Sequence, residues 1–332
     1  MKSKRVLITG MAGLLGSYFS RYLLEKGYNV IGIDDFSGGY VENLPEGVFC
    51  SNIDLTDFNA VKVFFVKHKP EYVYHFAAYA AEGLSPFIRT FNYQANVIAS
   101  ANLITASINN DVNKFIFTSS NGVYGEDNVP PFKETLVPKP IDPYGIAKYA
   151  IEMDLQAAYK QFGLRYSIVR PHNVVGMYQN IWDKYRNVIG IWIRQTLDNE
   201  PITVYGDGEQ IRAFSDMKFL NEPLEKLMYG FDSEIFNLGS DKEITLKEAA
   251  CLVKKVAQSY GYNPEIVHLE PRVEAKYAYA EHTKAKELLG FDDKTDLEET
   301  IKQMFAWALT QPKRVVKYLS YETEKNIYGY WK

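Results

Sequence analysis

The sequence has little of what would mark a secreted, membrane-bound or metal-cluster protein. It contains two cysteines, Cys50 and Cys251, far apart in the chain, so neither a disulfide framework nor a cysteine-based metal site is expected. No apolar run reaches the roughly 18–20 residues of a membrane span, and residues 1–5 open directly onto a short apolar strand without a signal-peptide pattern. These absences predict a cytoplasmic protein with no membrane partner and no bound metal.

A strong net charge is absent as well. The formal net charge is -4, so no general field favours nucleic acid, and none is expected as a partner. Hydrophobic residues make up 46% and charged residues 23% of the chain, a balance typical of folded rather than disordered proteins. The 332 residues suffice for one large or two modest domains.

The first half of the chain alternates short apolar runs with amphipathic stretches. This rhythm predicts an α/β fold, a doubly wound parallel sheet whose carboxyl edge binds ligands. The expected strands are Arg5–Thr9, Tyr28–Ile33, Val48–Ile53, Tyr72–Phe76, Lys114–Thr118 and Arg165–Val169. The expected helices are Leu14–Lys26, Asn59–Lys67, Asn96–Ile108 and Tyr144–Phe162.

The rhythm ends after Arg170, where loop signals and glycine and proline punctuation follow. We therefore predict a dinucleotide-binding domain over residues 1–171 plus about 211–243. A smaller substrate domain is expected over residues 172–210 plus about 244–332. Two of its helices are well signalled, Leu246–Ser259 behind a Thr245/Glu248 capping box and Leu297–Leu309. The tail 313–332 is either a packed extension or a frayed end.

A glycine-rich turn joins the first strand to the first helix. Gly10, Gly13 and Gly16 allow a tight turn and a close approach of the backbone to a pyrophosphate at the helix N-terminus. Asp34 ends the second strand, where a carboxylate can accept the ribose hydroxyls, and Asp35 adds a charge that disfavours a 2′-phosphate. The turn therefore predicts NAD rather than NADP. Asp54, after the third strand, is a candidate partner for the adenine amino group.

A second group of residues predicts proton-transfer chemistry. Tyr144 and Lys148 stand four residues apart on one face of a helix. A lysine cation and a nicotinamide ring would favour the phenolate and lower the pKa of the tyrosine. Ser120 ends the fifth strand and could present its hydroxyl to the same substrate oxygen. The other Tyr–Lys pairs at this spacing do not follow a strand end in this way.

Six motifs stand in a fixed order along the chain. They are Gly10-Met-Ala-Gly13-Leu-Leu-Gly16, His75-Phe-Ala-Ala78, Thr118-Ser-Ser-Asn-Gly-Val-Tyr-Gly125, Asp142-Pro-Tyr-Gly-Ile-Ala-Lys148, Arg170-Pro-His-Asn173 and Gly206-Asp-Gly-Glu-Gln-Ile-Arg212. With these motifs the chain resembles the extended short-chain dehydrogenase/reductase family, in particular nucleotide-sugar 4-epimerases of the UDP-glucose 4-epimerase type. The resemblance runs from about residue 4 to about residue 310.

The resemblance implies roles at matching positions. Tyr144 corresponds to the catalytic base, Ser120 to the catalytic serine or threonine, and Lys148 to the lysine that also holds the nicotinamide ribose. Further cofactor contacts are implied at Leu14, Leu15, Leu55, Phe76, Ala77, Ala78, Asn96, Thr118, Pro171 and His172. Contacts to a nucleotide-sugar substrate are implied at Asn173, Asn187, Val188, Tyr205, Arg212, Arg272 and Ala278. The two arginines are natural partners for a diphosphate.

The residues after Ser120 bear on the reaction. Dehydratases and decarboxylases of the family carry a carboxylate there, whereas this chain has Asn121-Gly122. A double epimerase would need a catalytic Cys/His pair, and neither cysteine lies in a suitable motif. The resemblance then implies NAD-dependent epimerisation at C4 through a 4-keto sugar, with NAD regenerated. A net oxidoreductase or dehydratase of the same family, or a non-catalytic NAD or sugar-nucleotide binding protein, remains an alternative.

The sugar and the assembly state are less well determined. The small residue Ala278 falls where the family gates acetamido sugars, so glucose/galactose, N-acetyl and uronate forms all remain open. A one-residue slip would place Tyr277 or Tyr279 there instead. The resemblance also implies a homodimer, built on the helices near 96–108 and 144–162.

Overall fold

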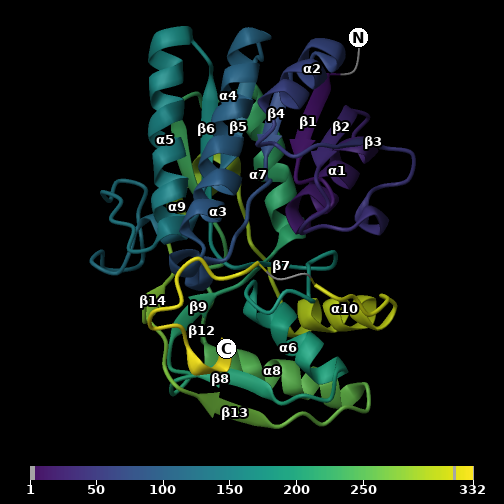
Figure 1. Ribbon diagram of the computed structural model, residues 1–332, viewed down its shortest axis with the longest axis vertical. Helices are drawn as coiled ribbons and strands as arrows, with labels where there is room; N and C mark the ends of the chain where they lie inside the picture. The colour runs from purple at the N-terminus through teal and green to yellow at the C-terminus, as the bar shows by residue number, and fades with distance from the viewer. Residues whose placement is uncertain (1–3, 317–318, 332) are drawn as a thin grey trace.

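The protein has a large upper part and a smaller lower part (Figure 1). The computed structural model describes residues 4–316 and 319–331. Within these ranges no helix is both long enough and apolar enough to cross a bilayer.

A seven-stranded parallel sheet forms the upper part, in the order β11-β6-β5-β4-β1-β2-β3. The predicted doubly wound α/β class is confirmed, and the six predicted strands are present with ends shifted by at most two residues. The seventh strand, β11, was not predicted. The strands are β1 Arg5–Thr9, β2 Asn29–Asp34, β3 Phe49–Asn52, β4 Tyr72–His75, β5 Lys114–Thr118, β6 Tyr166–Pro171 and β11 Glu234–Leu238.

Helices cover both faces of this sheet because its strands are apolar on both sides. In β1, Leu7 packs into the core with α2, α4 and α5, while Val6 and Ile8 pack into the opposite core with α1, α7 and α9. These helices are α1 Leu14–Glu25, α2 Phe58–His68, α4 Ala99–Asn109, α5 Pro143–Phe162, α7 Asn221–Lys226 and α9 Thr283–Leu289. Short helical turns connect them, namely η1 Val41–Asn43, η2 Glu82–Phe87, η4 Asn121–Val123, η5 Met217–Leu220 and η6 Leu227–Tyr229.

The helix α5 begins and ends where its sequence dictates. The Asp142 side chain accepts a hydrogen bond from Gly145 N, Pro143 occupies the first turn, and Gly163 closes the helix in the left-handed region. This start fixes Tyr144 in the first turn of α5. The helix predicted over 96–108 begins earlier, as α3 Arg89–Tyr93 followed by a π-helical turn, η3 Gln94–Ile98, before α4.

The lower part holds three small sheets and three helices (Figure 1). Its strands are β7 Val174–Val175 with β10 Ser215–Asp216, β8 Ile202–Tyr205 with β13 Ile266–Leu269, and β9 Ile211–Ala213 between β12 Glu243–Thr245 and β14 Tyr277–Ala278. Its helices are α6 Val188–Leu197, α8 Leu246–Ser259 and α10 Leu297–Leu309. The capping box predicted at Thr245/Glu248 is present.

The predicted domain limits do not follow the packing everywhere. β9 pairs with β12 and β14 in the lower part, although residues from 211 onward were assigned to the dinucleotide domain. Conversely, Ala285 and Leu289 of α9 return to the core of the large sheet. Pairing between distant segments decides these limits, and it leaves no local mark in the sequence.

The end of the described tail packs against the upper part of the molecule. Ile327 and Trp331, the latter in η7 Gly329–Trp331, are buried against Phe87 of η2. The hydroxyl oxygen of Tyr328 accepts a hydrogen bond from Val273 N at 3.1 Å, and Tyr328 also lines the cavity described below. The tail therefore closes one side of that cavity.

Candidate active site

One large cavity, of about 1000 Å³, lies at the carboxyl edge of the sheet and reaches into the lower part. All but two of the site residues predicted from the sequence line it. They are Gly10, Gly13, Leu14, Leu15, Gly16, Asp34, Asp35, Asp54, Leu55, Phe76, Ala77, Ala78, Thr118, Ser120, Tyr144, Lys148, Pro171, His172, Asn173, Asn187, Val188, Arg212, Arg272 and Ala278. The fold thus brings residues from both parts of the chain around one space.

The glycine turn at one end of this cavity has no room for side chains. Gly10 has a φ of 68°, and a β-carbon built on it would lie 2.7 Å from Ala77 N. A β-carbon on Gly16 would lie 2.2 Å from Gly10 O. The turn therefore presents bare backbone in front of the α1 N-terminus, the environment that a pyrophosphate requires. The residues present fit a dinucleotide.

Asp34 connects this turn to the end of β2. Its carboxylate accepts hydrogen bonds from Ala12 N at 2.9 Å and Phe36 N at 2.8 Å. Burial raises the pKa of Asp34, and these two backbone bonds oppose that effect. Asp34 thus holds the turn in place and lines the cavity where the adenosine ribose is expected. Asp54 accepts two bonds from Thr56, which orient its carboxylate.

The predicted catalytic group meets at the end of β5 and the start of α5. Ser120 caps η4 by accepting a hydrogen bond from Gly122 N at 3.0 Å. Tyr144 is nearly buried, with 8% of its surface exposed. Lys148 Nζ donates to Thr118 O at 2.8 Å and lies 5.8 Å from the centre of the Tyr144 ring.

The predicted effect of Lys148 on Tyr144 needs correction. Burial raises the pKa of Tyr144 above its usual range. The opposing influences are a hydrogen bond with Ser120 and the charge of Arg186. Burial also lowers the pKa of Lys148 to about 7, so this ammonium is only partly charged at neutral pH. Sequence spacing gave the right neighbours but not their desolvation.

Two predicted residues lie behind the cavity wall. Asn96 is buried in the π-helical turn, where its amide bonds the backbone of Tyr79 and the side chain of Asn92. It supports the wall segment after β4. Tyr205 stacks under the guanidinium of Arg272, whose Cζ lies 4.5 Å from the ring centre. Asn96 and Tyr205 are not among the residues that line the cavity, and their contacts with a ligand stay predictions.

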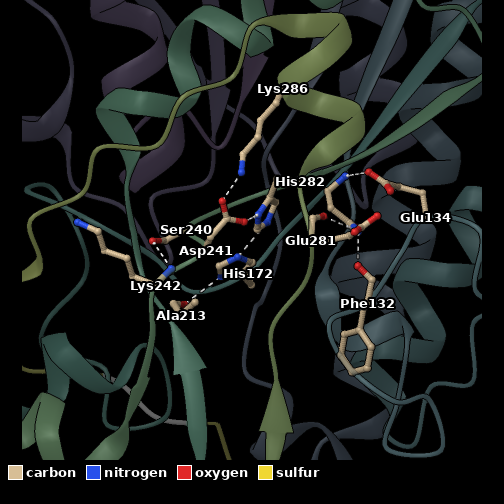
Figure 2. A network of polar contacts seen from close by, with 11 residues as sticks. Phe132, Glu134, His172, Ala213, Ser240, Asp241, Lys242, Glu281, His282 and Lys286 are labelled. Carbon is tan, nitrogen blue, oxygen red and sulfur yellow. Dashed lines mark hydrogen bonds and ion pairs between the residues drawn. The ribbon is translucent and has the colours of Figure 1, made fainter.

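His172 lines the cavity, yet its ring belongs to a polar network (Figure 2). Its Nδ1 bonds Ala213 O at 2.9 Å, and its Nε2 lies 3.2 Å from His282 Nε2. His282 in turn bonds Asp241, which pairs with Lys286. Burial lowers the pKa of His172 to about 3, so the ring stays neutral. This network ties the segment after β6 to β9 and α9.

The two predicted diphosphate arginines share one carboxylate. Arg212 Nη2 and Arg272 Nη2 each lie 3.1 Å from Glu274 Oε2. Glu274 also lines the cavity and was not predicted. The arrangement holds both guanidinium groups in place at the end of the cavity remote from the glycine turn.

Sequence reasoning also missed Arg186 and Glu82, which are charged residues of the cavity wall. Arg186 pairs with Asp183 at 2.9 Å, and its charge lowers the pKa of both Asp34 and Tyr144. It therefore acts on both the adenosine end and the catalytic end of the cavity. Its position beside Asn187 was the available signal. Glu82, in the first turn after the Ala77-Ala78 segment, lines the cavity near Ser120.

The fold and the cavity indicate the class, an NAD-binding enzyme of the short-chain dehydrogenase/reductase type. The sequence profile of the NAD dependent epimerase/dehydratase family matches residues 6–218. The chain belongs to this family, and the predicted NAD-dependent, epimerase-type enzyme is confirmed at that level.

Known relatives give this assignment more detail. The UDP-glucose 4-epimerase of Rhizobium leguminosarum bv. trifolii is 30% identical over 92% of this chain and 98% of its own length. A crystal structure of UDP-glucose 4-epimerase with UDP-glucose from Thermotoga maritima is 36% identical, with a TM-score of 0.86 over 92% of this chain and 98% of that one. The UDP-glucuronic acid decarboxylase 4 of Arabidopsis thaliana is also 30% identical, over 91% of this chain and 68% of its own length.

Proposed function

We propose that the protein inverts the configuration at C4 of a UDP-activated sugar through a transient 4-keto intermediate. The single observation that carries this proposal is the cavity that joins the dinucleotide turn, the Ser120/Tyr144/Lys148 group and the paired arginines. The names of the relatives support UDP as the carrier and C4 as the reacting carbon.

We assign cofactor binding and substrate binding to different residues along the cavity. The backbone of Gly10 and Gly13 and the carboxylate of Asp34 hold the dinucleotide. Arg212 and Arg272 take the diphosphate of the substrate, with Glu274 keeping the two guanidinium groups in register.

Tyr144 takes the proton of the 4-hydroxyl group and returns it after the sugar has turned, and Ser120 bonds the same oxygen. Bound NAD supplies a hydride acceptor that is regenerated within one turnover. Lys148 holds the segment after β5 through Thr118 O and carries the nicotinamide ribose. Because burial raises the pKa of Tyr144, proton removal becomes easier as the pH rises.

The space beside the sugar supports a tolerant site. Ala278 lines the cavity, whereas Tyr277 is exposed on the same short strand β14. Successive residues of a strand point to opposite sides, so the small residue faces the substrate. We infer that a 2-acetamido group fits as well as a 2-hydroxyl group.

The runner-up is a decarboxylase of the same family, because three relatives are named UDP-glucuronic acid decarboxylases. The experiment incubates the purified protein with UDP-glucose, UDP-N-acetylglucosamine or UDP-glucuronate, without added NAD. We expect the C4 epimer of at least one sugar, no net change in reduced cofactor and loss of turnover in Tyr144→Phe. Release of carbon dioxide, accumulation of a keto or reduced sugar, or no conversion at all would reject the proposal.

We also propose a homodimer formed through α4 and α5, which stand side by side in Figure 1. Ile151, Leu155 and Ala158 of α5 are buried against the sheet. Met153 is 54% exposed on the other side of this helix, about two turns after the exposed Ile146. An apolar outer face of this kind favours a helical interface. The cytoplasmic location stays a prediction.

A further inference from the structure

Glu82 places a carboxyl group at the sugar end of the cavity. It begins η2, directly after the wall segment that follows β4. A β-carbon built on Gly122 would lie 3.4 Å from Ser120 Oγ and 3.6 Å from Glu82 Oε1. The serine hydroxyl and the carboxyl thus border the same point, and Gly122 leaves the space between them open. The Glu82 residue is exposed and lines the cavity.

The position of Glu82 is fixed by the start of α5. Its carboxyl hydrogen-bonds the carboxyl of Asp142, the residue that caps α5. Ser85 of η2 donates to Glu82 O at 2.8 Å and accepts a bond from Tyr144 N at 3.2 Å. The turn that carries Glu82 is therefore tied to the turn that carries the catalytic tyrosine.

Two further carboxyl groups and two arginines surround Glu82 at this end of the cavity. Asp142 and Tyr144 face it from α5, Arg212 from β9, and Arg272 and Glu274 from the segment before β14. Both arginines already pair with Glu274 at 3.1 Å. Burial and the neighbouring Asp142 raise the pKa of Glu82 to about 7, so the pair of carboxyls holds one shared proton below that pH.

We propose that Glu82 determines substrate specificity, accepting hydrogen bonds from hydroxyl groups of a neutral hexose and rejecting sugars that carry a carboxylate. The enzyme then acts on UDP-hexoses or their N-acetyl forms and excludes UDP-uronates. This inference rests on the proposed function, since it names the substrate class of that same site. A hydroxyl group can donate to either oxygen of the carboxylate. A uronate carboxylate can donate to neither, and its charge opposes that of Glu82.

The expected discrimination is about a hundredfold or more in kcat/KM above pH 7. Uptake of one proton by the Glu82/Asp142 pair halves its negative charge and weakens the charge conflict, so kcat/KM for the uronate should rise as the pH falls from 8 to 6. Neutral sugars should show no such gain, because the phenol of Tyr144 is more difficult to ionise at low pH.

The test compares wild type with Glu82→Gln, Glu82→Asp and the control Glu265→Gln, which removes a charge from an exposed position before β13. Glu82→Gln should raise kcat/KM for UDP-glucuronate at least tenfold, mainly through KM, and should give it the same pH dependence as the neutral sugars. Glu82→Asp should keep the rejection, and Glu265→Gln should match wild type. Melting temperatures check that each variant folds.

Binding separates this inference from the proposed function. Calorimetric titration of UDP-glucose and UDP-glucuronate gives the ratio of their Kd values even if no sugar is inverted. The absence of inversion alone would reject only the proposed function. An unchanged ratio in Glu82→Gln, or a wild type that accepts the uronate as readily as the hexose, would overturn the role of Glu82. A 4-keto-6-deoxy product from wild type that disappears in Glu82→Gln would also overturn it, by assigning the carboxyl to an elimination.

Discussion

Replacing Gly16 by alanine should damage the cofactor turn although alanine favours helices. The added β-carbon would lie 2.2 Å from Gly10 O and 2.5 Å from Met11 Cα, both backbone atoms of the turn. Ordinary van der Waals contact needs more than a further ångström, so either the start of α1 or the turn must move. Because Gly10 itself is confined by Ala77, the turn has no free direction.

The magnitude follows from two opposing effects. Overpacking of a close contact costs about 1–3 kcal/mol, and a glycine-to-alanine change inside a helix returns about 1 kcal/mol. We expect the free energy of unfolding to fall by up to about 2 kcal/mol. Displacement of the turn should weaken NAD binding at least tenfold, which removes part of the ligand stabilisation as well.

Gly190→Ala provides a matched control inside helix α6. Its β-carbon would meet Gln179 and Ile181 at 3.5 Å, an ordinary contact, so this variant should be neutral or more stable by about 0.5–1 kcal/mol. Urea unfolding with and without NAD, together with the NAD content of the purified protein, measures both effects. A Gly16→Ala protein as stable as Gly190→Ala that retains its NAD would refute the reasoning.

Three further predictions concern the sugar, the buried lysine and the assembly. Ala278→Tyr should reduce kcat/KM for UDP-N-acetylgalactosamine at least tenfold relative to UDP-galactose. Equal selectivity in wild type and Ala278→Tyr would refute a role of Ala278 in selecting the 2-substituent of the sugar. Lys148 has a folded pKa of about 7 and an unfolded value near 10.4, so the cost of burying its charge is complete below pH 7 and is relieved as the pH rises. Lys148→Met should therefore gain about 2–3 kcal/mol more in unfolding free energy at pH 6 than at pH 9, a difference absent if the lysine stays charged. Met153→Lys should convert the homodimer to monomer by light scattering, whereas Val129→Lys, on an exposed loop, should not; two dimeric variants would exclude this face.

The sequence predicted those elements whose own residues decide them. The strands of the large sheet are short apolar runs, and α8 carries its own capping box, so periodicity and caps located them closely. β11 was missed because its five residues follow a stretch of loop signals. β9 and α9 were assigned to the wrong side of the predicted limits because their partners lie far away in the chain.

The same division holds for the site. Gly10, Ser120 and Tyr144 belong to local motifs, and the fold gathers them around one cavity. Glu274 and Arg186 enter the cavity only because loops of the lower part close over it. The pKa of Tyr144 was misjudged for a related reason: spacing reveals a nearby lysine but not the desolvation that raises the pKa of the phenol and lowers that of the ammonium.

Glu82 shows why the reaction class should be argued from the cavity rather than from one motif. The residues after Ser120 carry no carboxylate, so the sequence favoured epimerisation, with a dehydratase of the same family kept as an alternative. The structure nevertheless brings a carboxyl to the same place from η2, on the far side of Gly122. A charged carboxylate there opposes a uronate, so the decarboxylase is disfavoured by electrostatics rather than by a missing group. Elimination of water from the sugar is excluded only if Glu82 binds the sugar and does not remove a proton from it. Analysis of the products of Glu82→Gln decides between these two roles.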